Sequence, residues 1–118
     1  MTIRKLIDKV QEEKPNTFDE VKLLEFINEI ETEVAHEFSD EFELYTVVDG
    51  TELIAPAPYD RLYVSYLKAM IDYANEEYAS YQMNQMQHVQ DYGDFVDWVV
   101  RENVNVESVV PARFRNIF

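Results

Sequence analysis

The sequence predicts an all-α fold: a small bundle of about four helices, with a loop or short β-hairpin inserted after the second helix and an extended C-terminal arm. The chain contains only two glycines, too few for the tight turns of an all-β protein. Its apolar residues recur every three or four positions, the spacing of amphipathic helices. We expect one helical domain over residues 1–103, with the insertion at about 40–57, and the arm over 104–118.

The first two helices have clear apolar faces. The first is predicted from Ile3 to about Glu13, and Pro15 stops it. Its buried face should consist of Ile3, Leu6, Ile7 and Val10. Asn16 or Thr17 can cap the second helix. The apolar face of this second helix combines residues at helical spacing: Phe18, Val21, Leu24, Ile27, Ile30, Val34 and Phe38.

Between Ser39 and Ala55 the apolar period changes. Asp49-Gly50 is typical of a two-residue turn with positive φ angles, so this stretch predicts a small β-hairpin or a compact loop. An isolated hairpin is marginally stable in water. It therefore either packs on the helices or pairs with another chain.

A proline-stiffened loop leads into the third helix, which we expect to start around Pro58 or Tyr59. Its wide aromatic face packs inside the domain or partly meets a neighbouring subunit. That face comprises Tyr59, Leu62, Tyr63, Tyr66, Leu67, Met70, Ile71, Tyr73, Ala74, Tyr78 and Tyr81. The polar residues Gln82 to Gln85 predict a break after it.

A fourth helix is predicted from about Met86 to about Asn103. Gly93 lies inside it at a cost of about 1 kcal/mol relative to alanine, so we expect close backbone contact there. From Val104 the helical pattern fails, and Pro111 interrupts the remaining segment. This apolar tail packs on its own domain or lies on a partner.

Composition narrows the class of protein. The 118 residues suffice for one domain with a sizeable core. The absence of cysteine excludes disulfides and cysteine metal sites, and it suits synthesis in a reducing compartment. There is no apolar signal segment and no run of about 18 apolar residues, so we expect a soluble protein without membrane association.

Charge sets a second bound. The 24 acidic and 10 basic side chains give a net charge of −14, which disfavours sequence-independent binding of DNA or RNA. This acidity can serve solubility alone, suit a basic protein partner, or resist a nearby nucleic acid. Acidic residues crowd positions 12–60, whereas residues 108–118 contain two arginines and no acid.

No set of residues predicts catalysis or a cofactor. Two glycines cannot form a phosphate-binding loop. Neither His36 nor His88 lies beside a motif that would pair it with a nucleophile. Glu33 and His36 form one E-x-x-H spacing, but a di-iron helix bundle needs a second such pair and two further glutamates. We therefore predict no enzyme, no metal site and no cofactor.

The loop and third helix resemble a known family. The segment Leu53-Ile-Ala-Pro-Ala-Pro-Tyr-Asp-Arg-Leu-Tyr and the tyrosine-rich helix after it resemble the head–tail connector, or adaptor, proteins of tailed phages and prophages. The resemblance is strongest from about Asp49 to Arg101, and the N-terminal helices match only in length and amphipathic pattern. Family members often carry glycine where this chain has Glu76, so the third helix is expected to run on here.

The resemblance implies a structural virion protein without catalytic residues. Such a protein assembles as a ring under the portal and extends the channel through which DNA passes without specific binding. The implied partners are further copies of this chain, the portal protein and a downstream head-closure or tail protein. The implied location is the head–tail junction of the virion, and the bacterial host cytoplasm during assembly.

Two segments are candidate partner-binding sites, because docking loops and arms commonly order on binding. The loop from Glu43 to Ile54 contributes Tyr45, Val47 and Val48. The tail contributes the apolar anchors Val109, Val110, Phe114 and Phe118, which would lie on an adjoining subunit or the portal, and Arg113 and Arg115, which would pair with acidic groups.

A rival from another class is an acidic helical regulator, such as a DNA mimic that occupies a basic nucleic-acid-binding protein. That protein would be a monomer or dimer, would bind less tightly at high salt, and would have no use for an apolar tail.

Overall fold

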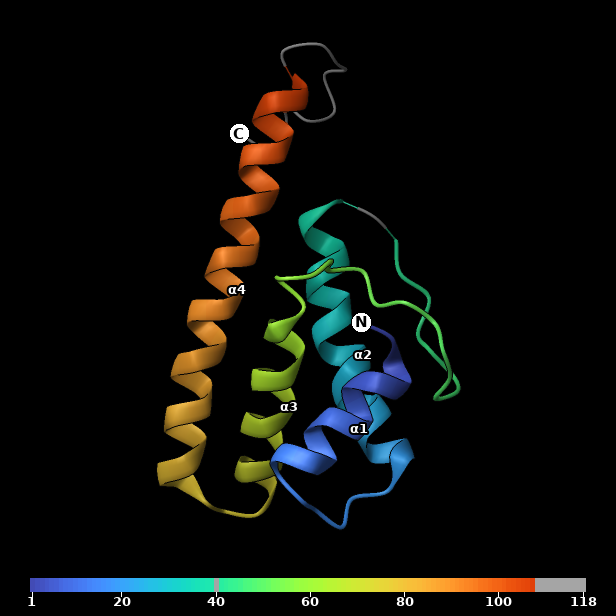
Figure 1. Cartoon of the computed structure of the whole chain (residues 1–118), viewed down its shortest axis with the longest axis vertical. Coiled ribbons are helices and arrows are strands. Elements are labelled where there is room, and N and C mark those ends of the chain that lie inside the picture. Colours follow the sequence, from blue (N-terminus) through green and yellow to red (C-terminus); the bar gives the residue numbers. More distant parts are fainter. Residues whose placement is uncertain (40, 108–118) are drawn as a thin grey trace.

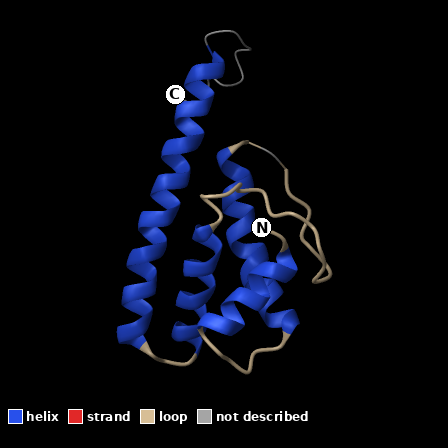
Figure 2. Cartoon of the chain, viewed as in Figure 1, coloured by secondary structure: helices blue, strands red, loops and turns tan. Residues whose placement is uncertain are grey.

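The computed structural model describes residues 1–39 and 41–107 as a bundle of four helices (Figures 1 and 2). They are α1 (Ile3–Glu13), α2 (Glu20–Glu37), α3 (Arg61–Ala74) and α4 (Tyr78–Glu107). The predicted all-α bundle is confirmed. The residues predicted to form the arm lie outside the described part of the chain from residue 108 onward, and α4 extends beyond the expected helix end at 103.

The α1 helix forms as its sequence predicts. The Thr2 side chain caps it by accepting a hydrogen bond of 3.1 Å from the Lys5 amide. All four residues of its predicted apolar face are buried. The chain ends this helix before Pro15.

The start of α2 differs from the prediction. Asp19 is its N-cap and accepts a hydrogen bond of 2.9 Å from the Lys22 amide. Asn16 is engaged earlier in the connection, where its side chain accepts from the Phe18 amide at 3.1 Å. The helix therefore begins later than a cap at Asn16 or Thr17 would set it.

The start of α3 also differs. Residues Ala57–Asp60 form a turn, the Ala57–Pro58 peptide bond is cis, and the helix begins at Arg61. The Tyr59 amide donates to the Pro56 carbonyl at 2.8 Å. Pro58 therefore belongs to the entry turn instead of the first helical turn.

The predicted break at Gln82–Gln85 and the continuation of the third helix past Glu76 are both wrong. The chain leaves α3 through Glu76, whose φ is 59°. The Glu76 amide donates to Tyr73 at 3.1 Å and the Glu77 amide donates to Asp72 at 2.9 Å, the two hydrogen bonds of a Schellman motif. The α4 helix then starts at Tyr78 and runs through the polar stretch.

Asp72 fixes this turn to the rest of the bundle. Its fully buried carboxylate contacts the Lys14 ammonium at the end of α1 and accepts hydrogen bonds of 2.7 Å from Ser80 and Asn84 in α4. Burial would raise the pKa of Asp72, but these hydrogen bonds outweigh it and hold the pKa below its usual value. One carboxylate therefore joins three helices.

The inserted segment is a loop, since the described residues contain no paired strands. It is tied to the N-terminus by an isolated bridge between Thr2 and Glu52, and the Leu53 amide donates to the Met1 carbonyl at 2.9 Å. Neither glycine adopts a positive φ, so Asp49-Gly50 does not form the predicted hairpin turn.

The core lies around α3, which contacts α1, α2 and α4. Tyr63 of α3 and Phe95 of α4 are its largest fully buried side chains. Gly93 does not make the close contact predicted for it, because a Cβ there would meet no atom within 4 Å. The last turns of α4 extend beyond the other helices (Figure 1). Within residues 1–39 and 41–107, no helix is both long and apolar enough to span a membrane.

Candidate partner-binding surface

The structure places three of the nine predicted partner-binding residues. Tyr45, Val47 and Val48 lie in the loop between α2 and α3. The other six lie outside the described residues: Val109, Val110, Arg113, Phe114, Arg115 and Phe118. The geometry of the candidate surface is therefore that of the loop and of the helices around it.

The backbone of Tyr45 is held by the side chain of Asn28 in α2. The Tyr45 amide donates to Asn28 Oδ1 at 2.8 Å, and Asn28 Nδ2 donates to the Tyr45 carbonyl at 3.0 Å. This pair of hydrogen bonds imitates one rung of a β-ladder, with a side-chain amide in place of the second strand. These two hydrogen bonds fix the loop to α2 although no second strand pairs with it.

The carboxylate of Glu31 holds the same loop from inside. It is fully buried and accepts hydrogen bonds from the Tyr45 hydroxyl at 2.6 Å, the Ile54 amide at 3.0 Å and the Tyr63 hydroxyl at 2.5 Å. Tyr63 in turn accepts from the Ala55 amide at 2.9 Å. Burial and the nearby carboxylate raise the pKa of both tyrosines. These hydroxyls therefore stay protonated and keep donating to Glu31.

These contacts fix both ends of the loop before any partner arrives. Leu53 and Ala55 are buried, and Val48 is half-buried against the core. The most exposed apolar residues of the loop are Leu44 and Val47, which are 63% and 57% exposed, and Ile54 is 36% exposed. The loop is thus ordered without a partner, whereas the sequence predicts a segment that orders on binding. Of the predicted binding residues in the loop, Val47 is the exposed one.

A second exposed apolar surface lies on α4, where the sequence predicts no binding residue. Met83 and Met86 are each 74% exposed, Val89 is 61% exposed and Val100 is 38% exposed. The sequence contains a signal for it, because these residues fall outside the face that includes His88, Phe95 and Val99. Helical spacing separates the two apolar faces but does not show which of them is buried.

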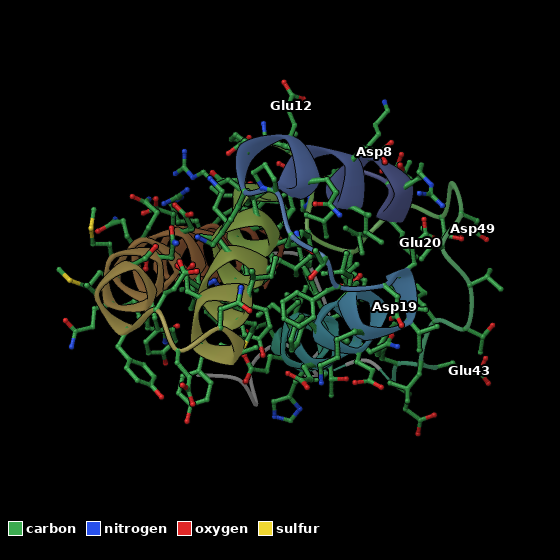
Figure 3. The ribbon with its side chains drawn as sticks, turned by 90° about the horizontal axis from the view of Figure 1, so that it is seen from below. Asp8, Glu12, Asp19, Glu20, Glu43 and Asp49 are labelled. Carbon is green, nitrogen blue, oxygen red and sulfur yellow. The ribbon has the colours of Figure 1, made fainter. Side chains whose placement is uncertain are left out.

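Several exposed acidic side chains lie on α1, at the start of α2 and in the loop. Figure 3 shows Asp8 and Glu12 on α1, Asp19 and Glu20 at the start of α2, and Glu43 and Asp49 in the loop, all directed outward. One exposed pair, Arg4 with Glu20, is joined by a hydrogen bond of 2.8 Å. We refer to these six residues as the acidic edge; exposed acids elsewhere, such as Asp97 and Glu102 on α4, also contribute to the −14 charge.

The residues considered for catalysis or metal binding do not come together into a site within the described part of the chain. Glu33 and His36 are both exposed, and no group of three potential metal ligands occurs within residues 1–39 and 41–107. His88 approaches Ser65 at 3.5 Å, but its Nδ1 lies 3.0 Å from the Leu62 carbonyl and must donate there. That ring nitrogen therefore has no lone pair with which to activate the serine.

Comparison with known proteins adds no relative: no protein-family model, no curated protein and no solved structure matches this chain.

Proposed function

We propose that this protein is a head–tail connector that assembles as a ring beneath a phage portal, extends the DNA channel and docks the next head-completion or tail protein. The observation that carries the proposal is the position of the segment that resembles the connector family. Leu53 and Ala55 are buried at the end of the loop, and Tyr63 joins this end to Glu31 of α2. The end of the loop that leads into Pro-Ala-Pro-Tyr-Asp is therefore held in a fixed position, which suits a surface that contacts another protein.

Three further properties support a structural role. The acidic edge repels the phosphate backbone, which suits a channel that DNA must pass without being held. Exposed apolar residues on the loop and on α4 suit contacts with other subunits. The sequence of the C-terminal segment combines apolar anchors with Arg113 and Arg115, a composition that suits an acidic or apolar receptor on the portal or an adjoining subunit.

The experiment is a truncation after Glu107, which leaves α4 intact. We expect the truncated chain to keep its circular dichroism spectrum and unfolding midpoint, but to lose association with a purified portal ring from the same genome, measured by analytical ultracentrifugation. Replacing Arg113 and Arg115 by alanine should weaken the same association. Undiminished binding of the truncated chain would show that residues 108–118 are not needed for portal association. Failure of the full chain to bind the portal would overturn the proposed connector function.

The acidic edge favours a second candidate, a regulator that mimics DNA. It predicts that the chain binds a basic nucleic-acid-binding protein with an affinity that falls steeply as salt is raised. Neutralising Asp8, Glu12, Asp19 and Glu20 together would abolish that binding. The connector proposal expects the same variant to retain portal association.

A further inference from the structure

The inserted loop completes the start of α1. The first amides of a helix have no acceptor within the helix itself. In α1, the Ile3 amide donates to the Thr51 carbonyl at 3.0 Å, and the Arg4 amide donates to the Asp49 carbonyl at 3.0 Å. The first turn of this helix therefore depends on the backbone of residues 49–51.

These two carbonyls lie on either side of Gly50. The bond between Asp49 and Gly50 is the one place in the sequence where an aspartate precedes a glycine, and no asparagine does. An aspartate side chain can cyclise onto the amide nitrogen of the next residue. A glycine at that position hinders the reaction least, because it has no Cβ. The sequence alone therefore makes Asp49–Gly50 the most reactive aspartyl bond of the chain.

The structure leaves this bond open to reaction. Asp49 and Gly50 are both exposed, and Figure 3 shows the Asp49 side chain directed outward, so water can reach the bond. A Cβ built at Gly50 would meet no atom within 4 Å, so no neighbouring group shields the glycine. Within the described part of the chain, the Gly50 amide donates no hydrogen bond. The nitrogen that would attack is therefore neither covered nor engaged.

The Asp49 side chain is already turned toward its own backbone. The Thr51 amide donates to Asp49 Oδ1 at 2.8 Å, which is the contact of an Asx turn. The ring closed by this hydrogen bond contains both Cγ of Asp49 and the amide nitrogen of Gly50. These are the two atoms between which the new bond would form. The folded loop thus keeps the reacting groups close together.

We propose that Asp49–Gly50 is a site of spontaneous isomerisation to isoaspartate, and that this modification detaches the loop from the start of α1. The inference goes beyond the proposed function and does not depend on it. It assigns to this chain a covalent modification site, whose product is a substrate for enzymes that methylate the free α-carboxyl group of isoaspartate.

The reaction needs only water. The Gly50 nitrogen bonds to Cγ of Asp49, and the hydroxyl group of the neutral carboxyl leaves with the amide hydrogen as water, which produces a succinimide ring. A water molecule then opens this ring. Breaking the bond between nitrogen and Cγ restores aspartate. Breaking the bond between nitrogen and the main-chain carbonyl carbon frees an α-carboxyl group and leaves Gly50 attached through Cγ.

Isoaspartate alters both acceptors of the α1 amides. The main chain then runs through Cβ and Cγ of Asp49 and is longer by one carbon atom. The former Asp49 carbonyl becomes part of a side-chain carboxylate, and the added atom shifts Thr51 relative to α1. The bridge between Thr2 and Glu52 still fixes the segment that follows. The two hydrogen bonds at the start of α1 therefore cannot both keep their geometry.

The test is to age the purified chain in mildly acidic buffer and to map isoaspartate in its peptides with an isoaspartate-specific methyltransferase. Hydrogen bonding from Thr51 holds the pKa of Asp49 below its usual value, so the neutral carboxyl group forms more readily in acid than at neutral pH. We expect methylation to accumulate in the peptide that contains residue 49 several-fold faster than in any other aspartate-containing peptide.

Two variants test the chemistry. Gly50→Ala is the matched control, because its Cβ hinders the attack but would meet no atom within 4 Å of the folded loop. Methylation at residue 49 should be several-fold slower in this variant. Asp49→Asn should form the same isoaspartate faster at neutral pH, with loss of ammonia, because its amide carries no charge that opposes the attacking nitrogen.

Hydrogen exchange tests the structural consequence. In the aged wild-type chain, exchange at the Ile3 and Arg4 amides should become faster, whereas aged Gly50→Ala should keep its original rates. Isoaspartate that accumulates at residue 49 no faster than at other aspartates would overturn the site. Complete modification with unchanged exchange at these two amides would overturn the detachment of the loop. Portal association is measured with fresh protein, so its failure bears only on the proposed function.

Discussion

Glu76 adopts the left-handed conformation that glycine favours, with φ at 59°. A side chain in this conformation destabilises the folded state by roughly 1 to 2 kcal/mol. Replacing it with glycine removes this strain, but glycine also makes the unfolded chain more flexible, which cancels part of the gain. Glu76→Gly should therefore raise the free energy of unfolding by about 1 kcal/mol. Urea denaturation measures this change. Glu77→Gly, one residue later and without a positive φ, should bring no gain. Equal effects of the two substitutions would contradict the argument.

Gly93→Ala should stabilise the protein. The substitution removes a helix-interior glycine and the added methyl group meets no neighbouring atom, so the free energy of unfolding should rise by about 1 kcal/mol. Urea denaturation of the dilute protein measures this change. A fall in the free energy of unfolding would contradict it.

His88 makes stability depend on pH near neutrality. Burial lowers its pKa in the folded protein, against the opposing effects of the Leu62 carbonyl and Asp91. As the pH falls, the His88 imidazole is therefore protonated in the unfolded chain before it is protonated in the folded protein. The contribution of neutral His88 to stability is complete above about pH 6.5 and is lost as the pH falls toward the folded pKa. We expect the free energy of unfolding to fall between about pH 7 and about pH 5.

The slope of this decline identifies the group. His88→Gln should flatten the pH dependence whatever its effect on absolute stability. An unchanged slope in His88→Gln would assign the titration to another residue.

The loop between α2 and α3 depends on one buried carboxylate. Glu31→Gln would place amide hydrogens against groups that already donate, including the Ile54 amide at 3.0 Å. We expect a loss of about 2 kcal/mol of stability and faster hydrogen exchange at Tyr45 and Ile54. Glu29→Gln is the matched control, because Glu29 also accepts from a tyrosine, Tyr66 at 2.9 Å, but is exposed. Similar losses in the two variants would contradict the role of burial.

At the scale of elements, sequence predicts the features that periodicity determines and misses those that distant contacts determine. The apolar face of α1 is predictable, since its residues repeat at helical spacing and a proline comes after them. The end of α3 is not predictable from sequence, because the left-handed position is occupied by Glu76 and not by a glycine. The turn is also held by Asp72, whose carboxylate contacts Lys14 at the end of α1. Glu31 leaves a faint signal, since it lies four residues after Ile27 and three before Val34 on the buried face.

The candidate surface is predictable in part for the same reason. An apolar residue in the loop can be recognised from sequence, but its exposure depends on Asn28 and Glu31, which lie far away in the chain. Apolar residues on α4 are ambiguous between core and surface because both faces repeat with the helical period. Packing against α3 decides which apolar face of α4 is buried and which stays exposed.

For the whole molecule, the net charge of −14 opposes compaction. The acidic edge brings several carboxylates together, and the molecule is at most 49 Å across. At low salt these carboxylates therefore repel one another. Raising the ionic strength from about 0.01 M to about 0.1 M shortens the screening length from about 30 Å to about 10 Å. This change relieves repulsion more in the folded chain than in the expanded unfolded chain.

We therefore expect the free energy of unfolding of the dilute protein to rise over this range of sodium chloride, measured by urea denaturation. Exposed ion pairs such as Arg4 with Glu20 weaken with salt, but such pairs contribute little to stability, so the repulsion should dominate. A variant with Glu12→Gln and Glu43→Gln, which reduces the charge of the acidic edge, should show a smaller rise. A fall in stability with salt would mean that the ion pairs outweigh the repulsion, and that the acidic edge does not strain the fold.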